Sequence, residues 1–335
     1  MRRLSATVAV GLLSLLASRV AADDEPPHRT PSPPGTVTLT FVGDIMLDGG
    51  PGHAIASGRD PFAACEALLL DADFTVGNLE CVLGDKGRQV LKAYTFRAAP
   101  DAPRHLARYF TAVSLGNNHA GDFGTEGLVE TLRILGERKI GSFGAGPSLA
   151  AARRPWILEK DGLRIALLAC NAFRPAHSAA GPDTPGVAPL VEADLLADIA
   201  AASRSADAVV PFVHWGPEAC PQPRDADIRL ARHMVEAGAA AVIGAHPHVT
   251  QTVDVHRGVP IVYSLGNFAF DYFPEDPPQW TGWVATLRFT KGQPVGLTTR
   301  AVVLDPAGLP HPATEDGTPT PGSRGAPPGR PVVRP

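Results

Sequence analysis

The segment SLGNNHAGDFG, residues 114–124, decides how the rest of this sequence is interpreted. It overlaps an apolar run from Phe110 to Leu115, which has the composition of a buried strand. Two asparagines, a histidine and an aspartate then stand among three glycines. Such a segment is either a simple turn or a turn that carries part of a reaction centre.

The same arrangement recurs where other apolar runs end. The polar residues in these positions are Asp44, Asn78, Glu80, Asn117, Asn118, His119, Asp122, His214, Glu218, His246, His248 and Asn267. If the strands are parallel neighbours, their carboxyl ends share one edge, which is where α/β folds bind ligands. Glycines beside them, such as Gly43 and Gly244, permit the close backbone approaches that this requires.

Each of these residues also has a simpler interpretation. The pair His246 and His248 is more often surface or hydrogen-bonded histidine than a ligand pair. Adjacent asparagines first of all indicate a turn, and Asp44 is acceptable as a helix cap. Taken together, four of the eleven histidines and four acids follow apolar strands with the same polarity. This joint pattern predicts a metal site.

The predicted ligands are imidazole, carboxylate and carboxamide groups, and only Cys81 and Cys220 lie near them in sequence. This set suits Mn, Fe or Zn, as one ion or two, and argues against a structural zinc site built from thiolates. Two neighbouring metals would suit displacement at a phosphorus or carbonyl centre. His119 would then act beside them as a general acid or a substrate-binding group.

The ends of the chain are predicted to lie outside the folded body. Residues 1–22 resemble a signal peptide, with Arg2 and Arg3 before the apolar run ATVAVGLLSLLA; an uncleaved membrane anchor is the alternative. We therefore expect an exported protein, periplasmic or extracellular. Residues 23–36 are predicted to be a proline-rich linker, residues 37–304 one domain, and residues 305–335 a disordered Pro/Gly-rich tail.

The net charge limits which classes of partner the protein can bind, and the cysteine content limits how it could be cross-linked. Loss of residues 1–22 removes three arginines and no acid, so the formal net charge changes from -4 to -7. An acidic protein without a basic face is a poor nucleic-acid binder. The cysteines Cys65, Cys81, Cys170 and Cys220 could form disulfides in an oxidising compartment, in any of three pairings.

The order of elements predicts an α/β fold. Strands are expected at residues 36–42, 73–78, 91–98, 163–170 and 207–215, and then at 249–256, 259–265, 283–289 and 295–304. Helices are expected at residues 60–72, 125–139, 192–203 and 224–237, with Asp60 and Thr125 as caps. The runs 163–170 and 207–215 are nearly all apolar, which is typical of strands buried on both faces. Packed sheets with helices outside follow from this order.

Six motifs in order carry a family resemblance: GDIML, GNLE, NNHAGDFG, HWGPE, GAHPH and YSLGNF, all within residues 37–270. Together they resemble the CapA family of bacterial capsule and poly-γ-glutamate synthesis proteins, which is similar in turn to the calcineurin-like metallophosphatases. The resemblance implies a four-layer αββα sandwich, in which two mixed β-sheets are flanked by helices.

The resemblance also implies roles for the polar residues. The implied metal ligands are Asp44, Glu80, Asn118, His214, His246 and His248, with His119 as the catalytic neighbour and Asp122 orienting it. We further predict that Asn78, Arg97, Asn117, Glu218 and Asn267 lie on the substrate side. In the segment AYTFRAAP, Arg97 would clamp a carboxylate or phosphate, with Lys92 and Tyr94 nearby; a solvated surface strand is the alternative.

Two departures from the metallophosphatase pattern bear on activity. Met46 stands where the first motif has a histidine, and neutral Asn78 stands at or near the bridging aspartate, so Glu80 must supply that charge. The sequence therefore leaves three functions open. The first is an exported metal-dependent hydrolase acting on an anionic surface polymer or its precursor, alongside membrane-bound synthesis machinery. The others are a non-catalytic polymer-binding assembly or export factor, and a metal-dependent epimerase.

Overall fold

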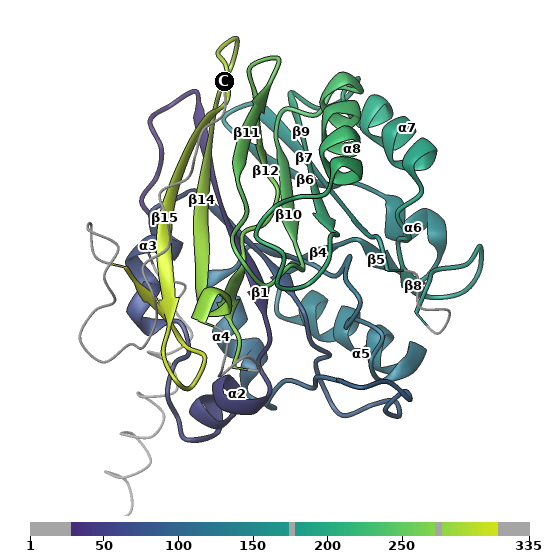
Figure 1. Cartoon of the computed structure of the whole chain (residues 1–335), viewed down its shortest axis with the longest axis vertical. Coiled ribbons are helices and arrows are strands. Elements are labelled where there is room, and N and C mark those ends of the chain that lie inside the picture. Colours follow the sequence, from purple (N-terminus) through teal and green to yellow (C-terminus); the bar gives the residue numbers. More distant parts are fainter. Residues whose placement is uncertain (1–27, 174–177, 272–276, 314–335) are drawn as a thin grey trace, which may run out of the picture.

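A computed structural model describes residues 28–173, 178–271 and 277–313 (Figure 1). The predicted signal peptide, residues 23–27 of the predicted linker and residues 314–335 of the predicted tail lie outside these ranges. Within these ranges, no helix combines the length and apolar character needed to span a bilayer.

The first β-sheet, called sheet 1 here, is built around β1 (Thr36–Ile45) and has the strand order β16-β15-β14-β1-β2-β3-β4. Its other strands are β2 (Phe74–Leu79), β3 (Ala112–Ser114), β4 (Gly141–Phe143), β14 (Thr281–Thr290), β15 (Gly296–Leu304) and β16 (Pro310–Pro312). The strands β1 to β4 run parallel, whereas β14 to β16 pair antiparallel. A short strand, β13 (Asn267–Ala269), pairs parallel with the carboxyl end of β1.

The second sheet, sheet 2, has the order β11-β12-β10-β9-β7-β6. Its strands are β6 (Trp156–Lys160), β7 (Leu163–Asn171), β9 (Ala208–His214), β10 (Val242–Ala245), β11 (Val253–His256) and β12 (Val259–Val262). The four central strands β7, β9, β10 and β12 are parallel. A separate two-stranded sheet joins β5 (Ala145–Gly146) to β8 (Gly186–Val187).

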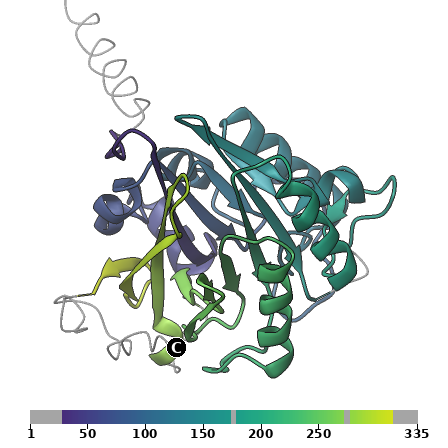
Figure 2. The same cartoon turned by 90° about the horizontal axis from the view of Figure 1, so that it is seen from above.

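Helices cover the outer face of each sheet. The helices on sheet 1 are α2 (Gly49–Ala56), η1 (Ala63–Cys65), α3 (Glu66–Leu70), α4 (Ala102–Tyr109) and α5 (Gly124–Glu137), and those on sheet 2 are α6 (Leu149–Arg153), α7 (Glu192–Ala202) and α8 (Asp225–Glu236). A further short helix, η2 (Pro277–Trp280), precedes β14. Figure 1 shows α7 and α8 side by side, and Figure 2 shows the strands with helices on either side.

Alternation along the central strands produces the layers. In β7, Ile165 and Leu167 point into the apolar cluster between the two sheets, whereas Ala166 points to the cluster under the outer helices. The two sheets meet through Phe41 and Phe212, whose rings pack edge to face with centroids 5.8 Å apart. The predicted four-layer αββα sandwich of two mixed sheets is therefore confirmed, as is burial of the central strands on both faces.

The segment 91–98, predicted to be a strand, is an irregular loop in which only an isolated bridge joins Val82 to Arg97. Two of its backbone N–H groups donate to carboxylates instead of a neighbouring strand: Phe96 N–H to Asp122 at 2.8 Å and Arg97 N–H to Asp48 at 2.9 Å. The segment therefore lacks a paired neighbouring strand among the described residues, and its apolar residues Leu91 and Tyr94 are exposed.

Both predicted helix caps are also wrong. Asp60 accepts from Phe62 N–H at 3.0 Å, and the first helical turn begins only at Ala63, as a 3-10 helix. In α5, Phe123 is the N-cap and Thr125 makes no capping bond. A turn around Asp60 and the tight GDFG turn before α5 replace the expected caps.

The folded body extends beyond both predicted limits. After Leu304, Asp305 accepts from Ala307 N–H and Leu309 N–H, and the turn leads into β16, which pairs with β15. Before β1, the Arg29 guanidinium donates to Leu69 O and Tyr109 O. Hydrogen bonds to backbone carbonyl groups therefore hold the end of the segment predicted to be a linker. Strand pairing holds the start of the segment predicted to be a tail.

The four cysteines, all within the described residues, are unpaired. Cys65, Cys81 and Cys170 are buried, and burial raises the pKa of each thiol to about 12. None of the three possible disulfide pairings is present, so packing rather than cross-linking holds the fold.

Asp73 ties the two sheets together at the end where β1 begins. Its carboxylate, 4% exposed, accepts from Lys160 Nζ at 2.6 Å, Thr38 N–H at 2.8 Å and Ser32 N–H at 3.0 Å. Burial alone would raise the pKa of Asp73, but these donors outweigh it and lower the pKa to about 2. One side chain thus joins the segment before β1, sheet 1 and sheet 2.

We expect Asp73→Asn to lower the free energy of unfolding by about 1–3 kcal/mol at neutral pH, because buried donors lose a charged acceptor. A group with a lowered folded-state pKa stabilises above its unfolded value and loses this effect as pH falls through the folded value. The deficit should therefore be largest at pH 7 and shrink between about pH 4 and pH 2. Urea unfolding of both proteins across this range measures it. Asp71→Asn, at an exposed neighbouring site, is the control; a pH-independent deficit would contradict the assignment.

Candidate metal centre

The carboxyl ends of the parallel strands of both sheets meet in one place, as the sequence predicted. Asp44 is the last residue but one of β1, Glu80 directly follows β2, and the turn 117–122 follows β3. From sheet 2, His214 ends β9, and His246 and His248 follow β10. Asn267 differs from these residues because it lies at the start of a strand, β13, where it pairs with Asp44. Residues separated by up to 223 positions thus share one site.

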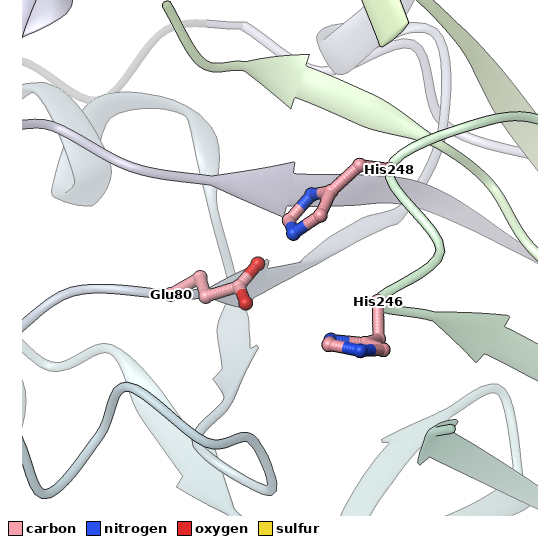
Figure 3. Close-up of side chains that lie close together, drawn as sticks. All are labelled: Glu80, His246 and His248. Carbon is pink, nitrogen blue, oxygen red and sulfur yellow. The ribbon is translucent and has the colours of Figure 1, made fainter. Parts of the chain in front are cut away.

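Glu80 lies at the middle of this cluster. Its side chain is fully buried, and neither carboxylate oxygen has a hydrogen-bond partner among the described residues. Two overlapping groups with ligand atoms within 4.8 Å of one another contain it: Glu80 with His246 and His248, and Glu80 with Asp44 and His214. Figure 3 shows the Glu80 carboxylate and the rings of His246 and His248 turned toward a common space. A carboxylate that belongs to both groups is suited to bridge two positions.

Asp44 and His248 are held by the protein itself. Asp44 Oδ2 lies 3.3 Å from His248 Nδ1 and accepts from the backbone N–H of His246 at 3.2 Å, while its Oδ1 accepts from Asn78 Nδ2 at 2.8 Å. His248 Nδ1 also lies 2.8 Å from Asn267 Oδ1. These contacts on Nδ1 orient the His248 ring, as partners behind metal-binding histidines commonly do.

His214 links the two sheets at the centre. Its Nε2 lies 2.7 Å from Asn118 Oδ1 and 3.4 Å from Glu80 Oε1, and its Nδ1 lies 3.2 Å from Asn78 Nδ2. Asn118 is the one half-buried member of the predicted ligand set, because it sits at the exposed side of its turn. The predicted metal ligands are therefore all brought together.

Burial dominates the electrostatics. It lowers the pKa of His214 to about 3 and that of His246 well below its ordinary value, so both rings are neutral and able to bind a cation. Burial, reinforced by the charge of Asp44, raises the pKa of Glu80 well above its usual range. For Asp44 and His248, their mutual hydrogen bond and charges outweigh burial, so the pKa of Asp44 is lowered and that of His248 is raised.

The two histidines after β10 adopt backbone conformations that are rare for residues other than glycine. The φ angle is 97° at His246 and 57° at His248. Such conformations cost about 1–3 kcal/mol each and persist where the surroundings impose them, often at functional sites. Here they turn both rings out of the strand direction and toward Glu80, with Pro247 between them.

His119 and Asp122 form a second buried group beside Glu80. His119 Nδ1 lies 2.7 Å from Asp122 Oδ2, and its Nε2 lies 4.0 Å from Glu80 Oε1. Burial lowers the pKa of His119 although Asp122 opposes the shift. The Phe96 ring packs over the imidazole with centroids 4.4 Å apart. The Nε2 atom therefore faces the centre while Nδ1 is held from behind.

Three predicted substrate-side asparagines have internal partners instead. Asn78 bonds to Asp44, Asn117 Nδ2 donates to Asn78 Oδ1 and Leu79 O, and Asn267 donates to Gln279 O. All three are at most 1% exposed. They hold the ligand-bearing turns in place, because a buried amide can satisfy several backbone and side-chain groups at once.

The predicted clamp Arg97 is committed elsewhere. Its guanidinium donates to Gly84 O at 2.6 Å and Lys86 O at 2.9 Å and lies over the Phe123 ring. Glu218, by contrast, is exposed beside the centre, and its charge helps to raise the pKa of both Glu80 and His248. Of the predicted substrate-side residues, only Glu218 is in a position to meet a ligand.

Sequence reasoning missed residues at the end of β7. Asn171 pairs with His214 across the sheet, and the Phe173 ring packs on His246 with centroids 4.0 Å apart. The rule that parallel strands end at the site would have found both, had it been applied to the run 163–170. A groove of about 490 Å³ lies at the opposite ends of the strands, lined by Ile165, Phe289 and others, and takes no part in this centre.

Comparison with known proteins establishes the family. Residues 38–272 match the family described as "Bacterial capsule synthesis protein PGA_cap", so the chain belongs to this family of bacterial capsule synthesis proteins. The match contains every residue of the centre and excludes β14, β15 and β16.

Two relatives are similar over most of the body. The "PGA biosynthesis protein CapA" of Bacillus subtilis (strain 168) is 34% identical over 245 residues, which are 70% of this chain and 63% of that protein. The "Capsule biosynthesis protein CapA" of Bacillus anthracis is 32% identical over 252 residues, 70% of this chain and 60% of that protein. The chain thus spans less than two thirds of the length of either relative.

Among solved structures, the "calcineurin-like phosphoesterase YfkN" of Bacillus subtilis superposes with a TM-score of 0.47 at 13% identity, covering 80% of this chain and 91% of that one.

We expect Glu80→Gln to abolish metal-dependent stabilisation. In the wild type, Mn²⁺ at about 100 times its dissociation constant should raise the melting temperature by about 5 °C. The amide cannot bridge two positions, so the variant should show little shift. Without metal, Glu80→Gln should be at least as stable as the wild type, because it removes an unpaired buried carboxylate.

Thermal unfolding of chelator-treated protein with and without Mn²⁺ measures both effects. Glu126→Gln, an exposed site in the first turn of α5, is the matched control and should behave as the wild type. Equal metal shifts in Glu80→Gln and the wild type would exclude Glu80 as a ligand.

Proposed function

We propose that this protein is an exported, metal-dependent hydrolase that acts on an anionic surface polymer of the capsule or poly-γ-glutamate type, or on its precursor. One observation carries the proposal. Both oxygens of the fully buried Glu80 lack a hydrogen-bond partner in the described part of the chain, and His214, His246 and His248 surround them. An unpaired carboxylate in such a place is costly, and a cation would compensate it.

The side chains present fit a metal. Asp44, Glu80 and His214 would hold one position, and Glu80, His246 and His248 the other, with Asn118 beside His214. Carboxylate, imidazole and carboxamide ligands suit Mn, Fe or Zn. When bound, such an ion polarises a phosphoryl or carbonyl oxygen and activates water.

The protein's own acid–base group would be His119. Its Nε2 faces the centre and its Nδ1 contacts Asp122, so a proton held on Nε2 would be directed at a leaving group placed next to Glu80. Such positioned proton transfer contributes about 10²–10⁴-fold to a rate. Asp122 would keep the ring oriented through the reaction.

The sequence and the relatives support the proposed polymer and the proposed compartment. Two relatives carry names that refer to capsule or PGA biosynthesis, and the apolar run after Arg2 and Arg3 resembles an export signal, which supports the proposed compartment. A substrate made outside the cytoplasm would bring the protein beside membrane-bound synthesis machinery. A cation at the centre would attract an anionic chain locally despite the protein's net negative charge.

A second candidate is a non-catalytic polymer-binding assembly or export factor. Met46, at the position of the first-motif histidine, is fully buried in the apolar cluster under the helices of sheet 1. Asn78 is neutral and already bonded to Asp44. The centre therefore has fewer ligands than the metallophosphatase pattern, and a site reduced in this way favours binding without turnover.

We expect His119→Ala to retain metal but to lower hydrolysis by about 10²–10⁴-fold. Metal content by elemental analysis and initial rates on phosphoesters and on γ-glutamyl peptides measure the two effects separately. His53→Ala, at an exposed site in α2, is the control. Wild type and His119→Ala that bind the polymer equally and hydrolyse nothing would favour the second candidate.

A further inference from the structure

The Lys92 side chain points inward, toward the turn after β3, although its sequence neighbours are exposed to solvent. Its side chain is 23% exposed, whereas Leu91 and Tyr94 are 105% and 56% exposed. The turn at residues 91–93 therefore has no apolar side chain to hold it against the body. Lys92 is the exception in this turn, and its inward direction must come from polar contacts of the ammonium group.

The Lys92 ammonium has three polar neighbours, and all belong to the turn after β3. It lies 2.7 Å from Asp122 Oδ1, 3.0 Å from Asn118 O and 3.2 Å from His119 Nδ1. One cation thus joins both ends of the turn that carries a predicted metal ligand and the predicted acid–base group. Two of its N–H groups donate to Asp122 Oδ1 and Asn118 O, whereas His119 Nδ1, in the tautomer that donates to Asp122 Oδ2, is a close neighbour and not an acceptor.

Asp122 depends on this cation. The side chain is 0% exposed, and its Oδ2 already serves His119 Nδ1 and Phe96 N–H, at 2.7 and 2.8 Å. The remaining oxygen faces Lys92 alone among the groups that the structure describes. Removing one partner of a buried ion pair leaves an uncompensated charge, which costs far more than a surface pair contributes.

The same loop places the aromatic neighbour of His119. Phe96 packs on the imidazole, and its backbone N–H is bonded to Asp122. Val90 N–H donates to Asp122 O at 2.9 Å, and Arg97 fixes the base of the loop at Gly84 O. Residues 84–98 therefore form a strap over the turn, anchored at its base by Arg97 and at its tip by Lys92.

We infer that Lys92 is a positioning residue, which fixes the direction of the His119 ring through Asp122 and the carbonyl of Asn118. The inference rests on the proposed function, in which His119 moves a proton. It replaces the expectation that the charges of this segment contact substrate, because the Lys92 ammonium and the Arg97 guanidinium both donate to groups within the protein.

Lys92→Met tests the inference, because it keeps the length of the side chain and removes charge and donors. In metal-free protein labelled with ¹⁵N-histidine, the wild type should show a slowly exchanging Nδ1–H signal of His119, assigned by its loss in His119→Gln. Lys92→Met should lose this signal. With metal bound, kcat should fall about 10–100-fold, while KM changes by less than about twofold.

Two further variants separate positioning from general damage. Lys86→Met, on the same strap but 68% exposed and, among the described residues, in an ion pair with Asp85 alone, should keep both the signal and the rate. Lys92→Arg, which keeps charge and donors, should restore the signal at least in part. If Lys92→Met does not fold, Lys92→Gln takes its place with the same expected loss.

A folded Lys92→Met or Lys92→Gln protein that keeps the His119 signal would overturn the inference. The signal does not depend on catalysis. If it behaves as expected while the wild type hydrolyses nothing, the positioning role of Lys92 stands and the proposed hydrolase function falls.

Discussion

The burial of Glu80 without a partner is the constraint on which the site depends. A carboxylate in a low-dielectric interior must be neutralised, paired or bound to a cation. Here Asp44 lies nearby with the same charge, and the imidazoles of His214 and His246, whose pKa values burial lowers, are neutral. An arrangement of this kind is unfavourable for an empty protein and favourable for one that holds a divalent ion, which ties the stability of the centre to its ligand.

The two sheets are what make such a cluster rigid. Asp44 and Glu80 come from sheet 1, whereas His214 and His246 come from sheet 2, so the centre exists only where the sheets pack. Within sheet 1 the backbones also approach closely beside Asp44: a Cβ at Gly43 in β1 would collide with the carbonyl of Gly266, which precedes β13. Buried asparagines then fill the space between strand ends with internal hydrogen bonds. The asparagines predicted to contact substrate thus hold the ligand-bearing turns in place, which restricts the movement of the ligand atoms.

Hydrogen bonding explains where sequence reasoning failed. Strand patterns in residues 91–98 were misinterpreted because the backbone there donates to Asp48 and Asp122, which no local pattern reveals. Arg97 has the charge to clamp an anion, but backbone carbonyls reach it first. Lys92 has the same charge and lies in the same segment, and its direction follows from acceptors on a turn 26 to 30 residues away. The charge of a side chain is known from the sequence, whereas the group to which that side chain donates its hydrogen bonds is not.

The sequence by itself determined the layers and the identity of the polar groups. Runs such as 163–170 are apolar on both faces, so they must be central strands, and polar residues after parallel strands must share an edge. Only the tertiary structure decided which of those groups remain unpaired. Whether a buried asparagine or carboxylate faces a neighbour or an open position depends on contacts between segments that are distant in sequence, such as Asn78 with Asp44, 34 residues apart. That distinction separates Asn78, which is satisfied, from Glu80, which is not.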